Sequence, residues 1–393
     1  MRDNFSKIRQ LSETRTIALP VLSSTQLRSH ENSNFLSVLL NDRSINISSE
    51  RLNQLKEELA SKPIIEKLIH PEVRYEVTNF CNATCIMCPR DKHSRLQGVM
   101  PQDDYEKSVD EVSALGAEKV VLTGFGEPLL DKKLEKKVAY LTGKGISSYF
   151  ITNASGLTKT RAQRLLDAEL DELRISFYGM TPKSYNLIMK GLDFARTKQK
   201  VADFIELRNK HSHKTKIQIS YLEMDENRDE TDSFVEYWES LVDAIEVWRP
   251  HNFGDGRDYR ERSNGYNLIE KETCGRPENG PLQIQWNGEI VPCCYDYNNA
   301  IVLGNAFQDN VLQILNSFKY RLLRYAHELG HFSIFPYCNQ CDQLLPRSDA
   351  LVYTNRHNLP PEDAVKLSNT DLYDLSRGRS IDDTSLSEKY SQK

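Results

Sequence analysis

The chain has 393 residues, enough for a barrel-sized domain and a smaller second one. Its net charge is −5, and 27% of its residues are charged. The sequence lacks the excess of basic residues that is typical of nucleic-acid binding. It also lacks a run of about 18 apolar residues that could span a membrane. No secretory signal pattern is present at the N-terminus. We therefore expect a soluble cytoplasmic protein with no nucleic-acid or membrane partner.

The first 70 residues are expected to form an N-terminal extension that is partly disordered. Leu52, Leu55 and Leu59 recur at helical spacing, which predicts a helix near 49–67 that Pro63 interrupts. The other end of the chain, 351–393, is rich in Asn, Asp, Ser, Arg and Lys and is predicted to be a disordered tail.

Between these ends, strand-like and helical patterns alternate. Period-two apolar runs predict strands at 73–78, 118–123, 147–152, 172–177, 216–222 and 244–249, and helical patterns fill the gaps at 102–115, 131–142, 158–170, 183–208 and 229–242. Six such alternations predict an α/β fold, a partial (β/α)6 TIM-like barrel over 71–260. Folds of this type place their chemistry at the carboxyl ends of the strands.

Three cysteines follow the first predicted strand directly. Thiolates such as those of Cys81, Cys85 and Cys88 are the usual ligands of a [4Fe–4S] cluster. The next cysteine is Cys274, so one iron would stay open to a small molecule. A structural zinc site closes all four positions, but on spacing alone a zinc knuckle or a chance cluster is the alternative.

This CxxxCxxC loop after a first strand resembles the signature of the radical S-adenosylmethionine (SAM) superfamily. In that family SAM chelates the open iron. An electron from the cluster then cleaves SAM to methionine and a 5′-deoxyadenosyl radical. The resemblance implies a flavodoxin- or ferredoxin-type electron donor. Met87 stands where the family often has an aromatic residue, and a methionine can still pack against a purine.

Residues at three further strand ends resemble SAM-binding positions of the family. The Gly-Phe-Gly-Glu turn at 124–127 looks like the Gly-Gly-Glu motif, in which Gly126 lets the backbone approach closely and Glu127 holds the SAM ammonium. Asn153 and Ser176 end the third and fourth strands, where similar residues bind the SAM ribose or carboxylate. For these two, an ordinary turn asparagine and an ordinary strand serine are the alternatives.

The sixth predicted strand leads into Arg249, His251 and Asn252. Their position suggests the substrate side of the barrel mouth, although rim residues without a role are an equal alternative. A base or a hydrogen-bonding cation such as Arg249 or His251 could assist proton loss from a substrate, so these two are the catalytic candidates.

A second cysteine set follows the barrel. Thirteen residues separate Cys274 from Gly288, and four separate Gly288 from Cys293. Residues 282–291 predict a β-hairpin with an Asn-Gly turn, which would bring the two cysteines together. A helix is expected over 309–328, before the pair Cys338 and Cys341.

This second set, within 261–350, resembles the start of the SPASM domain appended to many radical SAM enzymes. The absence of cysteines after Cys341 matches its shorter twitch version. The resemblance implies one auxiliary [4Fe–4S] cluster on Cys274, Cys293, Cys338 and Cys341. A four-cysteine zinc ribbon is the alternative. Cys294 is expected to be a thiol near the cluster or a buried small residue, with a role as alternate ligand left open.

Together these resemblances imply a radical SAM oxidoreductase. A small hydroxylated substrate, such as a sugar or an aminocyclitol, would lose a hydrogen atom to the radical, a proton to a base and an electron to the auxiliary cluster, which yields a ketone. A peptide- or protein-modifying radical SAM enzyme is the rival hypothesis. A structural zinc-binding protein is the alternative from another class.

Overall fold

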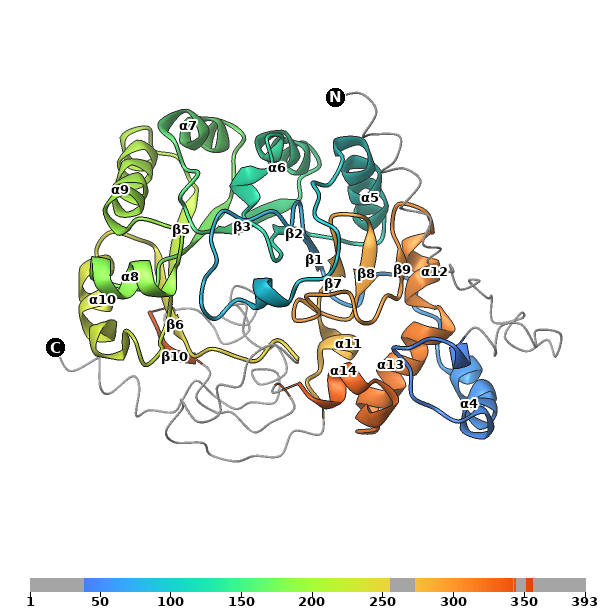
Figure 1. Cartoon of the computed structure of the whole chain (residues 1–393). Coiled ribbons are helices and arrows are strands. Elements are labelled where there is room, and N and C mark those ends of the chain that lie inside the picture. Colours follow the sequence, from blue (N-terminus) through green and yellow to red (C-terminus); the bar gives the residue numbers. More distant parts are fainter. Residues whose placement is uncertain (1–38, 255–272, 342, 344–350, 356–393) are drawn as a thin grey trace, which may run out of the picture.

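The computed structural model describes residues 39–254, 273–341, 343 and 351–355. Within this part of the chain, ten strands form one sheet of order β10-β6-β5-β4-β3-β2-β1-β7-β8-β9. Neighbouring strands from β1 to β6 are parallel and span Glu72–Tyr75, Lys119–Leu122, Ser147–Thr152, Glu172–Ser176, Lys216–Leu222 and Ala244–Trp248. The sheet curves but stays open, which confirms the partial barrel (Figure 1).

Helices connect successive parallel strands and cover the outer face of the sheet (Figure 1). They are α5 (Gln102–Ala114), α6 (Leu134–Gly143), α7 (Lys159–Asp167), α8 (Pro182–Ile188), α9 (Phe194–Lys210) and α10 (Thr231–Trp238). Short 3₁₀ helices occur at η1 (Pro89–Lys92), η2 (Pro128–Leu130) and η3 (Arg228–Glu230). Because each helix returns the chain to the same end of the sheet, the loops after the strands gather at one rim.

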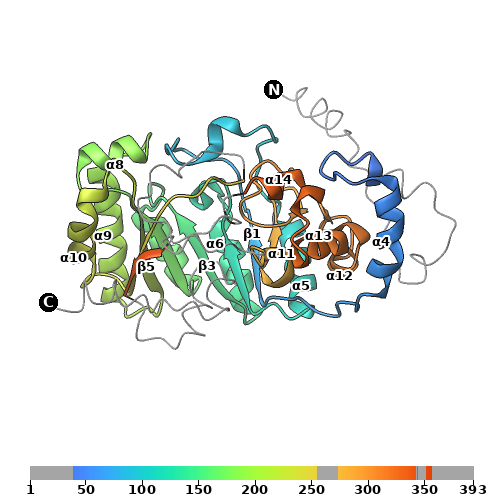
Figure 2. The same cartoon turned by 90° about the horizontal axis from the view of Figure 1, so that it is seen from below.

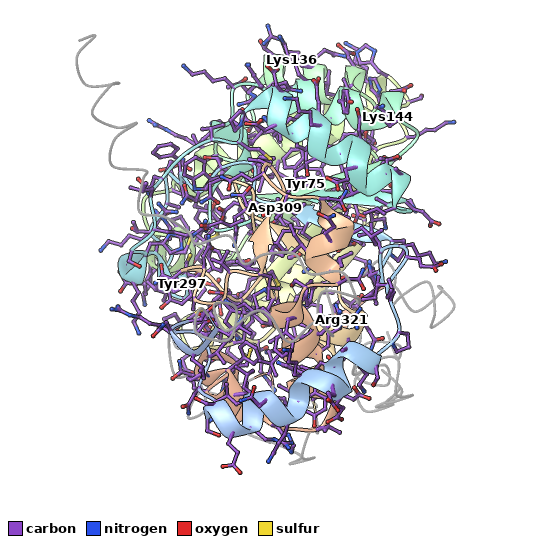
Figure 3. All side chains as sticks on the ribbon, turned by 90° about the vertical axis from the view of Figure 1, so that its right-hand side faces the viewer. Tyr75, Lys136, Lys144, Tyr297, Asp309 and Arg321 are labelled. Carbon is purple, nitrogen blue, oxygen red and sulfur yellow. The ribbon has the colours of Figure 1, made fainter. Side chains whose placement is uncertain are left out.

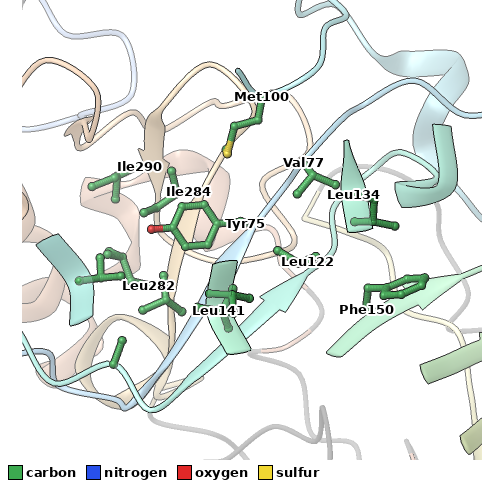
Figure 4. Packing of buried hydrophobic residues seen from close by; sticks show 14 of the residues in the cluster. Tyr75, Val77, Met100, Leu122, Leu134, Leu141, Phe150, Leu282, Ile284 and Ile290 are labelled. Atoms are coloured by element: carbon green, nitrogen blue, oxygen red, sulfur yellow. The ribbon is translucent and has the colours of Figure 1, made fainter. Parts of the chain in front are cut away.

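Side chains alternate between the two faces of β1, and this alternation divides the core from the barrel interior. Val73 and Tyr75 are fully buried in the outer apolar layer, where the Tyr75 ring lies among Leu282, Ile284 and Met100 (Figure 4). Glu72 and Arg74 alternate with them and lie on the concave face. Burial of such large apolar side chains contributes roughly 1.5–3 kcal/mol each to stability.

A hairpin continues the barrel sheet beyond β1. Strand β7 (Leu282–Ile284) runs parallel to β1, with Val73 opposite Leu282. Antiparallel strands β8 (Glu289–Val291) and β9 (Gly304–Asn305) follow. The predicted Asn-Gly turn is present, and Gly288 takes a φ of +86° that suits glycine. The second cysteine domain thus shares one sheet with the barrel.

Helices complete this second domain and join it to the N-terminal segment. They are α11 (Arg276–Asn279), α12 (Val311–Leu315), α13 (Phe318–Glu328), η5 (Phe332–Ile334) and α14 (Pro336–Asn339). Helix α4 (Ser49–Ser61) packs against α13, as Figures 1 and 2 show. Arg321, labelled in Figure 3, donates from Nη1 to the carbonyls of Leu59 and Lys62 at 3.0 and 2.9 Å. This guanidinium satisfies the carbonyl end of α4.

Three sequence predictions need correction. The helix expected over 183–208 is two helices, because the chain turns at Gly191 with a φ of +98° and restarts at the Asp193 cap. The helix expected over 309–328 is likewise broken, and Ser317 caps its second part. The tail predicted to be disordered begins with strand β10 (Leu351–Thr354), which pairs antiparallel with β6.

The remaining terminal predictions fall partly outside the described residues. The helix expected near 49–67 ends at Ser61, and the predicted disorder in 1–38 and 356–393 lies outside the described ranges. In the part of the chain that the structure describes, no helix has both the length and the apolar character needed to cross a bilayer.

Candidate functional site

The three-cysteine loop follows β1 and is held by the turn between α8 and α9. The amide of Thr84 donates to the carbonyl of Lys190 at 2.8 Å, and the amide of Ile86 donates to the carbonyl of Ile188 at 3.0 Å. A Cβ on Gly191 would lie 3.1 Å from the carbonyl oxygen of Asn82. The break in the expected long helix therefore forms the shelf on which the cysteine loop rests.

The thiols of this loop lie near one another and are partly buried. Burial, followed by the neighbouring thiols of Cys88 and Cys81, raises the pKa of Cys85 to about 12. Burial also raises the pKa of Cys81. Three such thiolates repel one another in an apolar setting, and a cationic iron cluster would relieve that repulsion. The donor set therefore fits the cluster that the sequence motif implies.

The glycines of the 124–127 turn are required by close contacts within the protein. A Cβ on Gly126 would lie 2.1 Å from the carbonyl oxygen of Thr78, and the amide of Glu127 donates to the carbonyl of Phe80 at 2.8 Å. Gly126 thus lets the turn pack closely against the backbone that precedes the cysteines. Arg90, which no sequence motif indicates, donates to the carbonyl of Phe125 at 2.6 Å.

Glu127 is 2% exposed, and three donors of its own chain bind its carboxylate. They are the Thr152 hydroxyl at 2.6 Å, the Asn153 amide at 2.7 Å and the Leu129 amide at 3.0 Å. Burial raises the pKa of Glu127 despite these hydrogen bonds. A carboxylate offers about four acceptor positions, so about one remains for a ligand ammonium.

The other two expected SAM-binding residues lie beside the cysteine loop. Asn153 is 7% exposed and donates from Nδ2 to Oδ1 of Asn82 at 3.2 Å. Ser176 ends β4 and hydrogen-bonds Tyr178. Burial raises the pKa of Tyr178 to about 12, and the thiols of Cys85 and Cys88 add to this shift. Tyr178 therefore lies near the cysteines, although no sequence motif singled it out.

A buried ion pair joins this rim to the second domain. Glu76, directly after β1, is fully buried and accepts two hydrogen bonds of 2.5 Å from the Arg95 guanidinium. Its carboxylate also accepts the Phe125 amide at 2.9 Å, and Arg95 donates to the carbonyl of Tyr297 at 2.7 Å. A bidentate pair of this kind orients both groups. No local sequence pattern indicated it.

The residues after β6 lie between the two cysteine sites. Arg249 donates to Glu223 at 3.3 Å. The His251 ring lies 4.0 Å, centroid to centroid, from both Phe253 and Tyr295. Phe253 in turn lies 5.6 Å from Phe125 of the 124–127 turn. A continuous row of aromatic rings thus runs from that turn towards the second cysteine set.

Asn252 and Phe253 connect this segment to the CxxC pair. Asn252 donates from Nδ2 to the carbonyl of Gln340 at 3.2 Å. The Tyr337 hydroxyl contacts the carbonyls of Phe253 and Tyr295, each at 2.8 Å. Phe253 has a φ of +56°, a conformation that is strained for a bulky residue and is often found at functional sites.

All four cysteines expected at the auxiliary cluster line one cavity. Its lining includes Cys274, Cys293, Cys338 and Cys341, together with His327. Burial raises the pKa of Cys338 well above its ordinary value, and the other three thiols add to this effect. Four thiols around one cavity, with Cys274 buried and the other three partly buried, match the ligand set of a fully protein-bound [4Fe–4S] cluster.

Cys294 is held outside that set. Its Sγ lies 3.3 Å from Nη1 of Arg74 and 3.9 Å from Nη1 of Arg276. Arg74 also pairs with Glu72 at 2.8 Å on the barrel interior. Among the described residues, no three His, Cys, Asp or Glu side chains are arranged to hold a single metal ion.

Comparison with known families matches both parts of the chain. Residues 75–235 match the radical SAM superfamily, and residues 274–342 match SPASM, an iron–sulfur cluster-binding domain. The second match favours an iron–sulfur cluster over zinc at the C-terminal cysteines.

Individual relatives are distant. A probable GTP 3′,8-cyclase of Methanococcus maripaludis is 25% identical over 175 residues, which cover 44% of this chain and 57% of that protein. A cofactor-modifying protein for the tungsten-containing aldehyde ferredoxin oxidoreductase of Pyrococcus furiosus is 23% identical over 308 residues, 68% of this chain and 85% of that protein. Matches to the first three archaeal cyclases span only 38–57% of their length.

The fold is shared with solved structures of this superfamily. SuiB of Streptococcus suis, bound to its precursor peptide SuiA, has a TM-score of 0.55 and is 16% identical, covering 79% of this chain and 80% of that one. The chain thus combines a [4Fe–4S] site for SAM with an auxiliary iron–sulfur domain, and it belongs to the radical SAM superfamily, with a SPASM domain at its C-terminal end.

Proposed function

We propose that this chain oxidises a small hydroxylated substrate, such as a sugar or an aminocyclitol, at a carbon that bears a hydroxyl. Cys81, Cys85 and Cys88 hold the SAM-binding cluster, and the four cysteines of the second cavity hold the auxiliary one. When bound, these groups supply a carbon-centred radical that removes one hydrogen atom and an acceptor for the remaining electron. With loss of the hydroxyl proton, the product is a ketone.

The single observation that carries the proposal is the cavity lined by Cys274, Cys293, Cys338 and Cys341. Four protein thiols leave no iron of the auxiliary cluster open to substrate, so we assign this cluster electron transfer, and a purely structural role is the alternative. Cys294, which contacts two arginines, is assigned no ligand role.

Residues at the mouth of the barrel are assigned to positioning SAM and moving the proton. Gly126, Glu127, Asn153 and Ser176 lie around the cysteine loop and are proposed to hold SAM. His251 is the preferred group for proton removal, because its ring contacts Tyr295, which lines the auxiliary cavity. Arg249 is the second candidate and is oriented by Glu223.

A peptide substrate is the second candidate, favoured by the fold shared with SuiB, whose solved complex contains a precursor peptide. In either case we expect a flavodoxin- or ferredoxin-type donor. We place the reaction in the cytoplasm, where thiols stay reduced, because none of the eight cysteines forms a disulfide. A panel of aminocyclitols and hexoses, compared with short peptides, separates the two substrates by which of them stimulates 5′-deoxyadenosine formation.

The auxiliary role is tested by replacing Cys338 and Cys341 with alanine in the full chain. We expect the loss of about four irons per chain, slower but measurable SAM cleavage and no net substrate oxidation. Cys294→Ala serves as the matched control and should keep both clusters. Unchanged turnover in the Cys338/Cys341 variant would make the auxiliary site structural and remove the main support for the dehydrogenase.

A further inference from the structure

One histidine of the auxiliary cavity has no role in the function proposed above. His327 lies on α13, is 2% exposed and lines the cavity with the four cysteines. Its Nδ1 lies 3.6 Å from Sγ of Cys274 and 3.3 Å from Oγ1 of Thr273. Its ring packs edge-on against Phe332, with 5.0 Å between centroids. Packing on one side and polar contacts on the other therefore fix the imidazole.

The hydrogen bonds of Thr273 determine which ring nitrogen carries the proton. A hydroxyl has one proton to donate, and Thr273 donates it to Oε1 of Glu278 at 2.9 Å. The same oxygen accepts the Gly275 amide at 3.0 Å. Nδ1 of His327 can therefore meet this oxygen only as a donor, and its N–H is also within reach of the Cys274 sulfur.

The second ring nitrogen leads to the same assignment. Nε2 of His327 is buried and has no hydrogen-bond partner among the described residues. A buried N–H without an acceptor is rarer than a buried acceptor without a donor. The proton therefore belongs on Nδ1, beside Cys274.

We propose that His327 is a positioning residue that donates an N–H hydrogen bond to the Cys274 sulfur and thereby raises the reduction potential of the auxiliary cluster. The proposal rests on the function above, because it needs Cys274 as a cluster ligand. A donor at a ligating sulfur stabilises the added negative charge of the reduced cluster. Thr273 and Glu278 act through the imidazole by holding its tautomer, and the cluster becomes a better electron acceptor.

The test uses the full chain with Cys81, Cys85 and Cys88 changed to alanine, so that only the auxiliary cluster remains. Its reduction potential is measured by anoxic spectroelectrochemistry. His327→Phe keeps a ring against Phe332 but removes the donor, and the potential should become more negative with the iron content unchanged. His327→Asn places an amide N–H where Nδ1 was and should restore most of the parent potential.

His331→Phe is the matched control, because His331 lies four residues further along and is exposed; its potential should equal that of the parent. An unchanged potential in His327→Phe, or an equal shift in His327→Phe and His327→Asn, overturns the proposal. If the His327→Phe variant loses its cluster, the Thr273→Val variant replaces it in the test. This variant keeps His327 but removes the hydroxyl that fixes its tautomer, and an unchanged potential would refute the proposal. A parent background without any cluster would refute the proposed function instead.

Discussion

At the scale of single residues, Glu127 combines two demands on one carboxylate. Three internal hydrogen bonds hold the turn, Thr152 and Asn153 together, and the remaining acceptor position is proposed for the SAM ammonium. Because a glutamine at this position presents an amide donor to groups that are themselves donors, it can satisfy neither demand fully.

We predict that Glu127→Gln weakens SAM binding by roughly 1.5–3 kcal/mol, the scale of hydrogen bonds to charged groups. Calorimetric titration of the reconstituted protein with SAM measures this change, and iron content should stay constant. Glu118→Gln, at an exposed position outside the turn, is the control. An unaltered SAM affinity would show that Glu127 only shapes the turn.

His93 provides a residue-scale test of burial. Burial, followed by the charges of Arg95 and Arg90, lowers its pKa to about 4, and both ring nitrogens are buried with no partner among the described residues. The ring stacks on Tyr297 at 5.7 Å. Between pH 6.5 and 4 the unfolded chain therefore binds more protons than the folded one, and stability falls as the pH falls.

We expect the His93→Phe variant to keep the stacking on Tyr297. When the pH is lowered from 7 to 5, its free energy of unfolding should fall by less than that of the parent. Titration of one group changes the free energy of unfolding by at most about 1.4 kcal/mol per pH unit. Because solvent screens the half-buried ring, we expect a change of about 0.5 kcal/mol per pH unit. Denaturant unfolding at the two pH values measures the difference. The exposed His211→Phe is the control, and equal pH sensitivity of His93→Phe and the parent would contradict the assignment.

At the scale of elements, the break between α8 and α9 supports the cysteine loop that we propose holds the first cluster. Gly191 has a φ of +98° and lies against Asn82, whereas Gly145 has a φ of +70° with nothing within 4 Å of its Cβ position. An alanine at either position carries left-handed strain of about 1 kcal/mol. Only at Gly191 would the added Cβ press on the cysteine loop.

We therefore predict that Gly191→Ala and Gly145→Ala lower the free energy of unfolding by similar amounts, about 1 kcal/mol. Gly191→Ala alone should also lower the iron content of the first site and the rate of SAM cleavage. Iron analysis and 5′-deoxyadenosine formation measure the two effects. Equal iron content in both variants would mean that the α8–α9 turn does not shape the cysteine loop.

Most elements were predictable because their periodicity is local. The six parallel strands and the Asn-Gly hairpin appear near their expected positions. The pairing of β7 with β1 was not predictable, because strand neighbours distant in sequence are selected by tertiary packing. The α8–α9 break was missed because a single glycine in an apolar helical pattern does not by itself end a helix.

The residues of the candidate site likewise divide into those that the sequence predicts and those that it does not. Both cysteine sets were recognisable because the sequence displays the short spacing that is expected of metal ligands. The Glu76–Arg95 pair, Arg90 and His327 carry no such spacing. Their partners lie on other elements, so only the folded arrangement brings them into contact.

At the scale of the whole molecule, β1 links the two proposed cluster sites. The first cysteine loop follows this strand, and Arg74 within it contacts Cys294, the neighbour of Cys293. Arg74 also pairs with Glu72 at 2.8 Å, and both side chains are 8% exposed. Breaking a buried pair leaves an uncompensated charge, which typically costs about 3–5 kcal/mol, whereas replacing both partners can be nearly neutral.

We predict that Arg74→Met lowers the free energy of unfolding by about 3–5 kcal/mol and that adding Glu72→Gln restores part of the loss. Lys62→Met is the control, because its 2.9 Å pair with Glu328 is exposed and contributes at most about 1 kcal/mol. Denaturant unfolding of the parent, Arg74→Met, Glu72→Gln and the double variant measures the coupling energy, and the visible spectrum of each reports on the auxiliary cluster. If the losses simply add in the double variant, the two charges act independently. In that case the strand would connect the two sites through its backbone alone, and the Arg74–Glu72 pair would have no part in the connection.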